Sequence, residues 1–436
     1  MVRRRHLRDG RRRRRPQLGA STAAAATHFS RELISSGLDR AVAAAKAADT
    51  AVLVVGSNPF INGREAHDRA STALSAGQAA LVKAVARANP RTVVVLQSSY
   101  PVSINWEQEH VPAVVWTTHA GAETGHAIAD VLFGDRNPSG RLTQTWYRSD
   151  RQLPPDLLEY DIISSGQTYL YSTAKPLYPF GHGLSYTRFR YGQLRADAQS
   201  VAADGTISVS VDVTNVGGRA GSEVVQLYTH QRTSRDKTPI RQLKAFQQVK
   251  LAPGQTRTVT LRLPAADLAH WDVTRSRWVV ESSVHDLMVG ASAEDIRART
   301  AIRVRGETIP ARDLSRPTRA ENFDRYAGSV SSTRRRPGYG RRCHRRRSVD
   351  LLRRLGPPCR RAHLHREGGQ AGADAGTIQI RLGSPTGRLL GTAAVPSTGD
   401  VHRYVDTGTD LARAAGNHDV YLVFDSALRL ADFSVR

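Results

Sequence analysis

Long apolar runs are absent from this sequence. In its 436 residues no run approaches the roughly 18 to 20 consecutive apolar residues that a membrane span requires. The first residues, MVRRRHLRDGRRRRRPQLGA, have the charge of the start of a signal peptide, but no hydrophobic segment follows them. The sequence therefore predicts no membrane partner, and it gives no indication of localisation.

Cysteine is scarce as well. The two cysteines, Cys343 and Cys359, form a C-x15-C pattern with His344, His363 and His365 nearby, which superficially resembles a set of zinc ligands. All five residues lie in an Arg-rich run, a setting that disfavours a tetrahedral cation site. We therefore expect no metal and no other cofactor.

The basic charge is confined to two segments. The formal net charge of the chain is +24. Residues 1–16 contribute +8 and residues 334–366 contribute +12, so these two Arg-rich runs supply +20 of the total. The rest of the chain is almost neutral, and the basicity is therefore not a property of a folded surface.

Three interpretations of the Arg-rich runs are open. An electrostatic arm for an anionic surface fits the charge, but the runs have almost no aromatic side chains to stack on bases, which argues against nucleic acid as a partner. A disordered tail (1–27) and a solvated linker also fit. Out-of-frame translation of a GC-rich gene is the third interpretation, because shifted codons yield Arg, Pro, Gly and Ala.

An α/β pattern begins at about residue 28. Apolar runs of strand length are AVLVVG (51–56), TVVVLQ (92–97) and AVVWTT (113–118). Helix-favouring segments lie around them, at 30–50, 75–90 and 122–134. This order predicts a mostly parallel, covered sheet, and hence a partial α/β sandwich over 28–175.

The expected helix ends carry recognisable signals. Ser75 and Gln78 have the spacing of a capping box at the start of the second helix. Glu123 is placed in the first turn of the third helix, where the helix dipole favours a negative charge. Gly134 stands at the C-terminal end of that helix, as expected for a residue that ends it.

Three loops leave the carboxyl ends of the predicted parallel strands. They are Ser57 to Arg69, the loop that begins Ser98-Ser99-Tyr100, and His119-Ala120-Gly121. In open parallel sheets, ligands bind beyond the carboxyl ends of the strands. The octapeptide NGREAHDR (62–69), with two carboxylates, two guanidinium groups and an imidazole, therefore lies where this architecture places its chemistry.

The pattern changes to all-β after a Pro- and Tyr-rich connector at 176–190. Ile207, Val209, Val211 and Val213 alternate with polar residues and precede a Gly-Gly turn, which is typical of a half-buried strand and hairpin. About seven such strands between 191 and 308 predict a β-sandwich of immunoglobulin or fibronectin type III kind.

A third unit is expected over 318–436. Ile378, Ile380 and Leu382 alternate, and Pro385-Thr386-Gly387 makes a turn. Because the Arg-rich run 334–366 interrupts this unit, we expect an incomplete, jelly-roll-like β-sandwich. The fold class is therefore multidomain, α/β plus all-β.

The order of these pieces resembles a known family. AADTAVLVVGSN, GREAHDR, VVVLQSSYPVSI, AVVWTTHAGAETGHAIADVLFGDRNPSGRLTQTW and YPFGHGLSYTRF together resemble the second domain of glycoside hydrolase family 3, which includes β-glucosidases and β-xylosidases. VDVTNVGGRAGSEVVQLYT and RWVVESS resemble the fibronectin type III-like domain that follows it in many members. AENFDRYAG and IRLGSPTGRLLGTAAVPSTGD resemble a family 6 carbohydrate-binding module.

The resemblance implies a specific chemistry. Members are retaining hydrolases with a carboxylate nucleophile and a general acid/base; the nucleophile lies in an N-terminal TIM-type barrel. The acid/base lies in a loop with the pattern Glu-Gly-x-Asp-Arg, onto which Glu65-Ala66-His67-Asp68-Arg69 maps. Glu65 is thus the implied acid/base, and Ala66 replaces the usual Gly. Nothing before residue 28 resembles the barrel, so we expect the chain alone to be inactive.

The implied substrates are β-linked oligosaccharides or glycosides, with terminal β-glucosides or β-xylosides hydrolysed once a barrel is supplied. Members of the family are often secreted or periplasmic. The alternative is a non-catalytic carbohydrate-binding or accessory protein. A basic nucleic-acid-binding protein is a third hypothesis, which a steep salt dependence of DNA affinity would favour.

The charges around Glu65 leave two interpretations of this residue open. A general acid needs a raised pKa, whereas Arg64, His67 and Arg69 would lower it. The conflict is resolved if Asp68 and Arg69 form a bidentate pair and Glu65 faces a drier cleft. Otherwise Glu65 is a solvated surface carboxylate.

The expected substrate-binding residues are His67, Arg69, Tyr100 and His119. His119 could also be drawn into a metal site with Glu123 and His126, at i, i+4 and i+7, but loop and helix-end roles are the simpler interpretation. Ser98 and Ser99 lie at the sheet edge without the G-x-S-x-G elbow of a serine hydrolase.

Four aromatic residues could stack on sugar rings. They are Tyr100, Trp106, Trp116 and Trp146. Packing in the core is the default interpretation for such residues.

Overall fold

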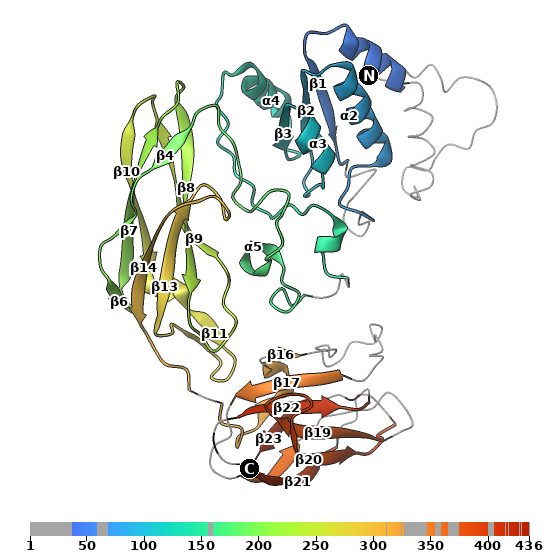
Figure 1. The fold of residues 1–436 in the computed structure, drawn as a ribbon, viewed down its shortest axis with the longest axis vertical. Coiled ribbons are helices and arrows are strands. Elements are labelled where there is room, and N and C mark those ends of the chain that lie inside the picture. The colour runs from blue at the N-terminus through green and yellow to red at the C-terminus, as the bar shows by residue number, and fades with distance from the viewer. Residues whose placement is uncertain are drawn as a thin grey trace, which may run out of the picture.

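The computed structural model describes most of the chain from residue 37 onward (Figure 1). The described residues are 37–58, 69–155, 160–310, 312–323, 325–326, 347–353, 359–364, 375–399, 405–414, 416, 418–426, 428 and 430–435. They form an α/β region, a central β-sandwich and a second β-sandwich, as the sequence predicts.

The α/β region is built on a three-stranded parallel sheet. Its strands are β1 (Ala51–Gly56), β2 (Thr92–Gln97) and β3 (Ala113–Thr117), in the order β1-β2-β3. Its helices are residues 37–46, α2 (Ala76–Ala88), α3 (Asn105–His110) and α4 (Thr124–Phe133). The predicted strands and parallel pairing are confirmed, and α3 is an addition, because six residues are too few for a clear helical period.

The core of this region lies between β2 and α2. Val94 and Leu96 of β2 are buried in one cluster with Val82 of α2 and with Trp146. The continuous apolar run at 92–97 is explained by this position, since β2 is the central strand and has both neighbours paired.

The start of α2 differs from the predicted capping box. The Ser75 hydroxyl accepts a bond from the Gln78 backbone N–H (3.4 Å), as expected for an N-cap. The Gln78 side chain, however, turns to β1: its Nε2 donates to the Gly56 carbonyl (2.8 Å) and its Oε1 accepts from the Gly56 N–H (3.2 Å). The glutamine therefore fastens the end of β1 rather than completing the box.

The far end of α4 matches expectation. Gly134 has φ +85° and ends the helix in the left-handed conformation. Glu123 occupies the N-cap position, one residue before α4, rather than the first turn.

Part of the surface of the α/β region is apolar and uncovered. Strand β1 is an edge strand, and Val52 and Val54 on it are 52% and 58% exposed. Helix α4 has no buried residue, and Phe133 at its end is 84% exposed. Exposed apolar side chains of this kind are a feature of interaction surfaces.

The connector runs back along the α/β region. It follows η2 (Asp150–Gln152) and α5 (Thr168–Tyr171). Backbone bonds join Leu142 to His182 and Trp146 to Tyr178. The sequence marked 176–190 as a connector, and these bonds make it an antiparallel partner of the segment around 142–146.

The central sandwich has two antiparallel-rich sheets. One is β10-β7-β4 with β5 beside β7, and the other is β6-β14-β13-β8-β9. The strand bounds are β4 (Phe189–Tyr191), β5 (Arg195–Ala196), β6 (Ser200–Ala202), β7 (Thr206–Asn215), β8 (Gly221–Gln231), β9 (Gln242–Leu251), β10 (Thr256–Pro264), β13 (Ser283–Gly290) and β14 (Ile296–Arg305). A two-stranded hairpin, β11 (His270–Asp272) with β12 (Arg277–Val279), follows η3 (Ala265–Leu268).

The predicted alternation of β7 is confirmed. Ile207, Val209, Val211 and Val213 are all buried in the core between the two sheets, and the polar residues between them are not. The period of two thus identified the inward face of the strand.

The second sandwich also has two sheets, β15-β23-β18-β21 and β16-β17-β22-β19-β20. The bounds are β15 (Thr318–Arg319), η4 (Ala320–Asn322), β16 (Arg325–Tyr326), β17 (Arg347–Arg353), β18 (Cys359–Leu364), β19 (Gly376–Leu382), β20 (Arg388–Val395), β21 (Thr407–Ala414), β22 (Asp419–Phe424) and β23 (Asp432–Val435). Ile378, Ile380 and Leu382 are buried in its core, as their alternation predicts.

The Arg-rich run behaves differently from the linker considered above. Two parts of it, β17 and β18, are paired strands: β17 lies against β22, and β18 lies against β21 and β23. The sequence RSVDLLR of β17 contains Val349 and Leu351 separated by Asp350, a period-two pattern that the arginines around it conceal. The solvated-linker interpretation therefore does not hold for these two segments.

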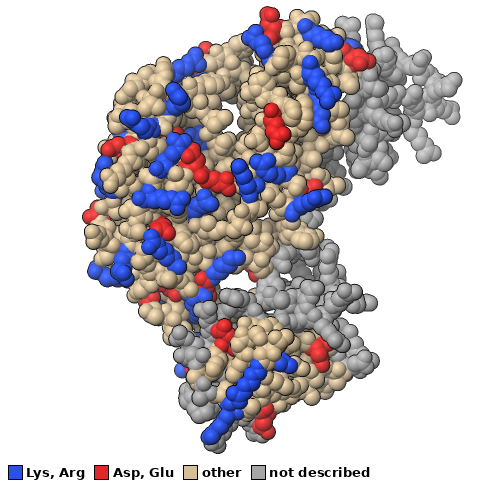
Figure 2. All heavy atoms as spheres, in the orientation of Figure 1, with Lys and Arg blue, Asp and Glu red and all other residues tan. Residues whose placement is uncertain are grey.

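Charges on the described surface are mixed. Basic and acidic side chains are intermixed over the face seen in Figure 2. Within the described residues, no helix is both long enough and apolar enough to cross a bilayer.

Candidate active-site edge of the parallel sheet

The first loop at the carboxyl edge of the sheet begins with a backbone that only glycine adopts easily. Gly56 has φ +146°, and a Cβ added there would lie 1.8 Å from the carbonyl oxygen of Gln97. The chain can therefore pass close to β2 and turn into the loop. The next residue, Ser57, donates its N–H to the same Gln97 oxygen (2.9 Å).

The hydroxyls of the first two loops meet at this edge. Ser57 Oγ donates to Ser98 Oγ (3.1 Å), and Ser98 Oγ donates to the Tyr100 carbonyl (2.8 Å) while it accepts from the Tyr100 N–H (3.1 Å). Because its proton is used in a bond to a carbonyl, Ser98 holds the loop in shape and is not poised as a nucleophile.

His119 joins all three loops. Its Nε2 lies 2.8 Å from the Ser57 carbonyl oxygen and its Nδ1 lies 2.8 Å from Ser99 Oγ. Because a carbonyl only accepts, this geometry assigns the proton to Nε2 and leaves Nδ1 to accept from the Ser99 hydroxyl. The imidazole thus fixes the relative position of the loops that follow β1, β2 and β3.

Arg69 and Tyr100 lie together on the exit side of the first loop. The guanidinium carbon of Arg69 is 5.1 Å from the centre of the Tyr100 ring, and Nη2 donates to the Pro101 carbonyl (3.0 Å). Burial lowers the pKa of Arg69, and nearby Tyr100 and Asp150 oppose the shift. The group keeps its charge at any ordinary pH, so it brings a positive charge and an aromatic face to the edge.

Asp150 fastens the chain directly after Arg69. Its carboxylate accepts from Ser71 Oγ (2.7 Å), Thr72 Oγ1 (2.6 Å) and the Thr72 N–H (2.8 Å). The bonds from Thr72 and Ser71 lower the pKa of Asp150, so the carboxylate stays charged and keeps these bonds. The first loop is therefore held at both of its described ends.

The structure does not test every residue chosen from the sequence. Glu65, His67 and Asp68 fall in 59–68, outside the described residues, so the expected Asp68–Arg69 pair also stays a prediction. Arg69, Tyr100 and His119 are described, and all three lie at the carboxyl edge of the sheet.

The alternative arrangement of His119, Glu123 and His126 is not formed. His126 Nδ1 pairs with Glu123 Oε2 at 2.6 Å, whereas His119 turns to Ser57 and Ser99. Over the described ranges, no group of three or more His, Cys, Asp or Glu is placed to hold a metal ion.

The tryptophans of the α/β region pack in its core. Trp146 is buried and meets Trp116 edge-on, with ring centroids 5.7 Å apart. Trp106 packs against the same cluster, while Tyr100 remains partly exposed at the edge. Of the four aromatic candidates for sugar stacking, Tyr100 is the one that the site retains.

Sequence reasoning missed three residues of this site. Gln78 was assigned to a helix cap, Ser57 was given no role beyond starting the loop, and Asp150 lies 78 positions from Thr72. A carboxylate at the start of a short 3-10 helix gives no local signal that it binds hydroxyls from a distant segment. Only the spatial meeting of the two segments reveals it.

Comparison with known protein families identifies three domains in the chain. Residues 8–186 match the glycosyl hydrolase family 3 C-terminal domain, residues 223–293 match a fibronectin type III-like domain, and residues 365–436 match a family 6 carbohydrate-binding module. The chain carries these three domains in this order, which confirms the resemblance found in the sequence.

Curated relatives are larger glycosidases. A β-xylosidase of Formosa agariphila is 41% identical over 273 residues, covering 62% of this chain and 37% of that protein. A β-glucosidase of Rhizobium radiobacter is 39% identical over 280 residues, covering 61% and 34%. The chain therefore spans about a third of the length of these relatives.

Solved structures give the same result. A β-glucosidase from Erythrobacter marinus aligns with a TM-score of 0.56 and 36% identity, covering 62% of this chain and 36% of that one. DesR, a β-glucosidase from Streptomyces venezuelae solved with D-glucose, aligns with a TM-score of 0.56 and 32% identity over the same shares.

Proposed function

We propose that this chain, which carries a glycosyl hydrolase family 3 C-terminal domain, supplies the general acid/base residue of a retaining β-glycosidase. Glu65 is the proposed acid/base. The observation that carries the proposal is the network of His119, Ser57 and Ser99, which gathers three loops at the carboxyl edge of the sheet. Glu65 belongs to the first of these loops.

Chain connectivity supports the choice of Glu65. It lies four residues before Arg69, so the two Cα atoms are at most about 14 Å apart. Arg69 itself is fastened to the Pro101 carbonyl and lies over the Tyr100 ring. The chain length therefore allows the Glu65 side chain to reach the same edge as the other proposed site residues.

The remaining site residues have separate proposed roles. Tyr100 offers a partly exposed aromatic face to a sugar ring. Arg69 and His67 supply hydrogen-bond donors for sugar hydroxyls. His119 orders the loops and faces the substrate with its exposed edge.

A second polypeptide region must provide the nucleophile in this proposal. Retaining hydrolysis needs two carboxylates about 5 Å apart on either side of the bond. The exposed apolar residues of β1 and α4 fit a surface that such a region covers, and the relatives are about three times as long as the matched part. Isolated, the chain is expected to be inactive.

The proposed substrates are terminal β-xylosides and β-glucosides, the classes that the relatives' names give. A carbohydrate-binding accessory protein is the second candidate. The match to a family 6 module supports it, because sugar binding by that module needs no second carboxylate.

The test is reconstitution. The part of the Formosa agariphila β-xylosidase that this chain does not match is expressed with this chain, and hydrolysis of xylobiose and 2,4-dinitrophenyl β-xyloside is measured. Glu65→Gln should lower kcat on xylobiose by roughly a hundredfold or more. The kcat/KM for the dinitrophenyl substrate should fall less, because its leaving group needs no proton from an acid and kcat/KM does not include the later hydrolysis of the glycosyl-enzyme.

Two controls make the result decisive. Asp68→Asn should affect the two substrates equally and less strongly. The relative's own C-terminal part, tested with the same N-terminal part, shows that reconstitution works. If that control is active and this chain is not, the accessory function is favoured instead.

A further inference from the structure

The hairpin β11–β12 of the central sandwich carries two exposed tryptophans. Trp271 and Trp278 are opposite each other across the hairpin and are 46% and 66% exposed. Their ring centroids are 5.8 Å apart and their planes meet at 77°. The two indole rings therefore meet edge-on and leave much of their surface open to solvent.

This exposure sets them apart from the other tryptophans. The chain has five, and the other three, Trp106, Trp116 and Trp146, pack in the α/β core. Two large apolar rings placed side by side in water form a surface patch that is characteristic of binding sites.

The opposite face of the hairpin is fixed by a buried carboxylate. Asp272 is fully buried and accepts from Arg275 Nε (2.5 Å), Arg235 Nη2 (3.1 Å) and the Thr274 N–H (2.9 Å). Burial alone would raise the pKa of Asp272, but these bonds outweigh it and hold the pKa well below its usual range. The carboxylate is thus a permanent anchor for the turn of the hairpin.

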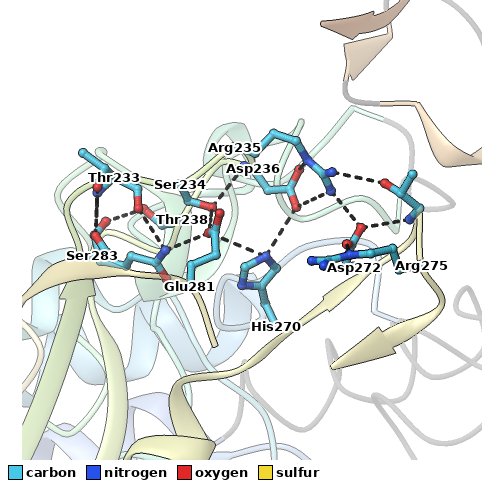
Figure 3. A network of polar contacts seen from close by, with 12 residues as sticks. Thr233, Ser234, Arg235, Asp236, Thr238, His270, Asp272, Arg275, Glu281 and Ser283 are labelled. Atoms are coloured by element: carbon cyan, nitrogen blue, oxygen red, sulfur yellow. Dashed lines mark hydrogen bonds and ion pairs between the residues drawn. The ribbon is translucent and has the colours of Figure 1, made fainter. Parts of the chain in front are cut away.

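A second polar cluster surrounds the start of β11 (Figure 3). His270 Nε2 lies 3.6 Å from Asp236 Oδ2 and 3.7 Å from Glu281 Oε2. Glu281 also accepts from Gln231 Nε2 (2.8 Å) and from Ser234 Oγ. The loop at 233–238 is thereby tied to the hairpin and to the strand that follows it.

Glu307, which follows β14, also holds the turn of the hairpin. It pairs with Arg275 Nη1 (3.0 Å) and with Arg277 Nη2 (2.5 Å). With Asp272 and Glu307 both holding the turn, the backbone that carries Trp271 and Trp278 is ordered before any ligand arrives. A preorganised surface loses little conformational entropy on binding.

The hairpin also touches the segment that leads into the second sandwich. Asn322 Nδ2 donates to the Val273 carbonyl at 3.2 Å. The tryptophan pair therefore lies where the fibronectin type III-like domain meets the segment that leads to the family 6 module.

We propose that Trp271 and Trp278 form a carbohydrate-binding site on the central sandwich, which takes a pyranose unit of a β-linked glucan or xylan chain. The C–H face of the sugar packs on one indole, the second indole closes the side, and the hydroxyls stay in water. The polymer then runs from the hairpin toward the second sandwich. The carbohydrate class rests on the proposed function, but the site needs neither Glu65 nor a second carboxylate.

The experiment uses the absence of tryptophan from residues 279–436, which makes the family 6 module silent in tryptophan fluorescence. Acrylamide quenching of the full chain is measured with xylohexaose, cellohexaose or neither. The two exposed rings should be quenched first, and one of the sugars should protect them. Trp271→Ala and Trp278→Ala should each weaken that affinity by about twofold to tenfold.

The controls separate binding from folding. Phe246→Ala removes an aromatic ring that is also 66% exposed in the same domain but lies on β9, away from the hairpin, and it should leave affinity unchanged. Trp278→Phe should retain most of the affinity. Unchanged affinity reported by the remaining exposed ring in both the Trp271→Ala and the Trp278→Ala variants, or no protection in the native chain, overturns the proposal.

Other occupants give different results. Self-association that depends on concentration and disappears in the Trp271→Ala/Trp278→Ala variant would assign the pair to contact between two copies of the chain, and would overturn the sugar site. Because the readout is binding, a failed reconstitution of hydrolysis leaves the result of this experiment intact.

Discussion

Arg141 Nη2 lies 2.6 Å from Glu223 Oε1, with both side chains almost entirely buried. Arg141 belongs to the segment after α4, and Glu223 to strand β8 of the central sandwich. The carboxylate also accepts from the Val224 N–H (2.8 Å). An ion pair is thus buried between two parts of the chain that are 82 positions apart.

Breaking this pair from one side should be costly. Arg141→Met leaves the Glu223 carboxylate buried without its cation, which typically lowers the free energy of unfolding by about 3–5 kcal/mol. Urea unfolding followed by circular dichroism measures the loss. Arg141→Met/Glu223→Leu should recover most of it, and a loss below about 1 kcal/mol in the single variant would contradict the burial of the pair.

His119 should stabilise the sheet edge through its two bonds. His119→Ala removes the contacts to Ser57 and Ser99, and at about 0.5–1.5 kcal/mol for each bond we expect a loss of about 1–3 kcal/mol. His126→Ala is the matched control, because its pair with Glu123 joins two residues at the start of the same helix and links no separate loops, and exposed pairs of this kind contribute little. Equal effects of the two variants on the unfolding midpoint would argue against the role of His119.

Two glycines of the α/β region should respond to alanine with opposite signs. At Gly56 a Cβ would meet the Gln97 carbonyl oxygen at 1.8 Å and φ is +146°, so Gly56→Ala should lower the unfolding midpoint markedly. Gly125 lies in α4 with nothing within 4 Å of a Cβ. Gly125→Ala should stabilise by about 0.5–1 kcal/mol, the usual gain in a helix. Differential scanning calorimetry compares both, and destabilisation by Gly125→Ala would be the contrary result.

His285 should make the chain acid-sensitive. It is buried on β13, and neither ring nitrogen has a hydrogen-bond partner among the described residues. Burial lowers its pKa to about 4, with Lys244 and His230 adding to the shift and Asp286 opposing it.

The direction in which stability changes with pH follows from the difference in proton binding between the folded and unfolded states. Between about pH 6.5 and pH 4 the unfolded state takes up a proton that the folded state does not, so stability falls as the pH falls through this window. The full loss is about 3 kcal/mol. Above pH 6.5 the histidine has no effect. His285→Phe should flatten the dependence when the unfolding free energy is measured from pH 7 to pH 4, and an unchanged slope would refute the assignment.

Much of the fold could be predicted from periodicity. The apolar run at 92–97 and the alternation at Ile207 to Val213 each identified a strand and its buried faces, because burial imposes these patterns directly on the sequence. The short helix α3 and the strand β17 were not predicted. Six residues are too few to show a helical period in α3, and arginines surround the apolar residues of β17.

The candidate site was predictable only in outline. Parallel strands bring their carboxyl ends to one edge, so the meeting of the loops with Arg69, Tyr100 and His119 followed from topology. The parts played by Asp150 and Gln78 did not, since each depends on a contact between distant segments. The segment RWVVESS, which contains β12, was recognised as a strand-length piece, but its pairing with β11 and the exposure of both tryptophans have no sequence signature.

The burial of Arg141 against Glu223 also bears on how such proteins recombine. A gene that received the α/β half from one parent and the sandwich from another would bring a charged group into a dry boundary without its counterpart. Gln226 Nε2, which donates to the carbonyls of both Gly181 and Ala291, adds a second such constraint. Recombination during evolution should therefore transfer the α/β region and the central sandwich together, whereas the C-terminal module is exchanged more freely.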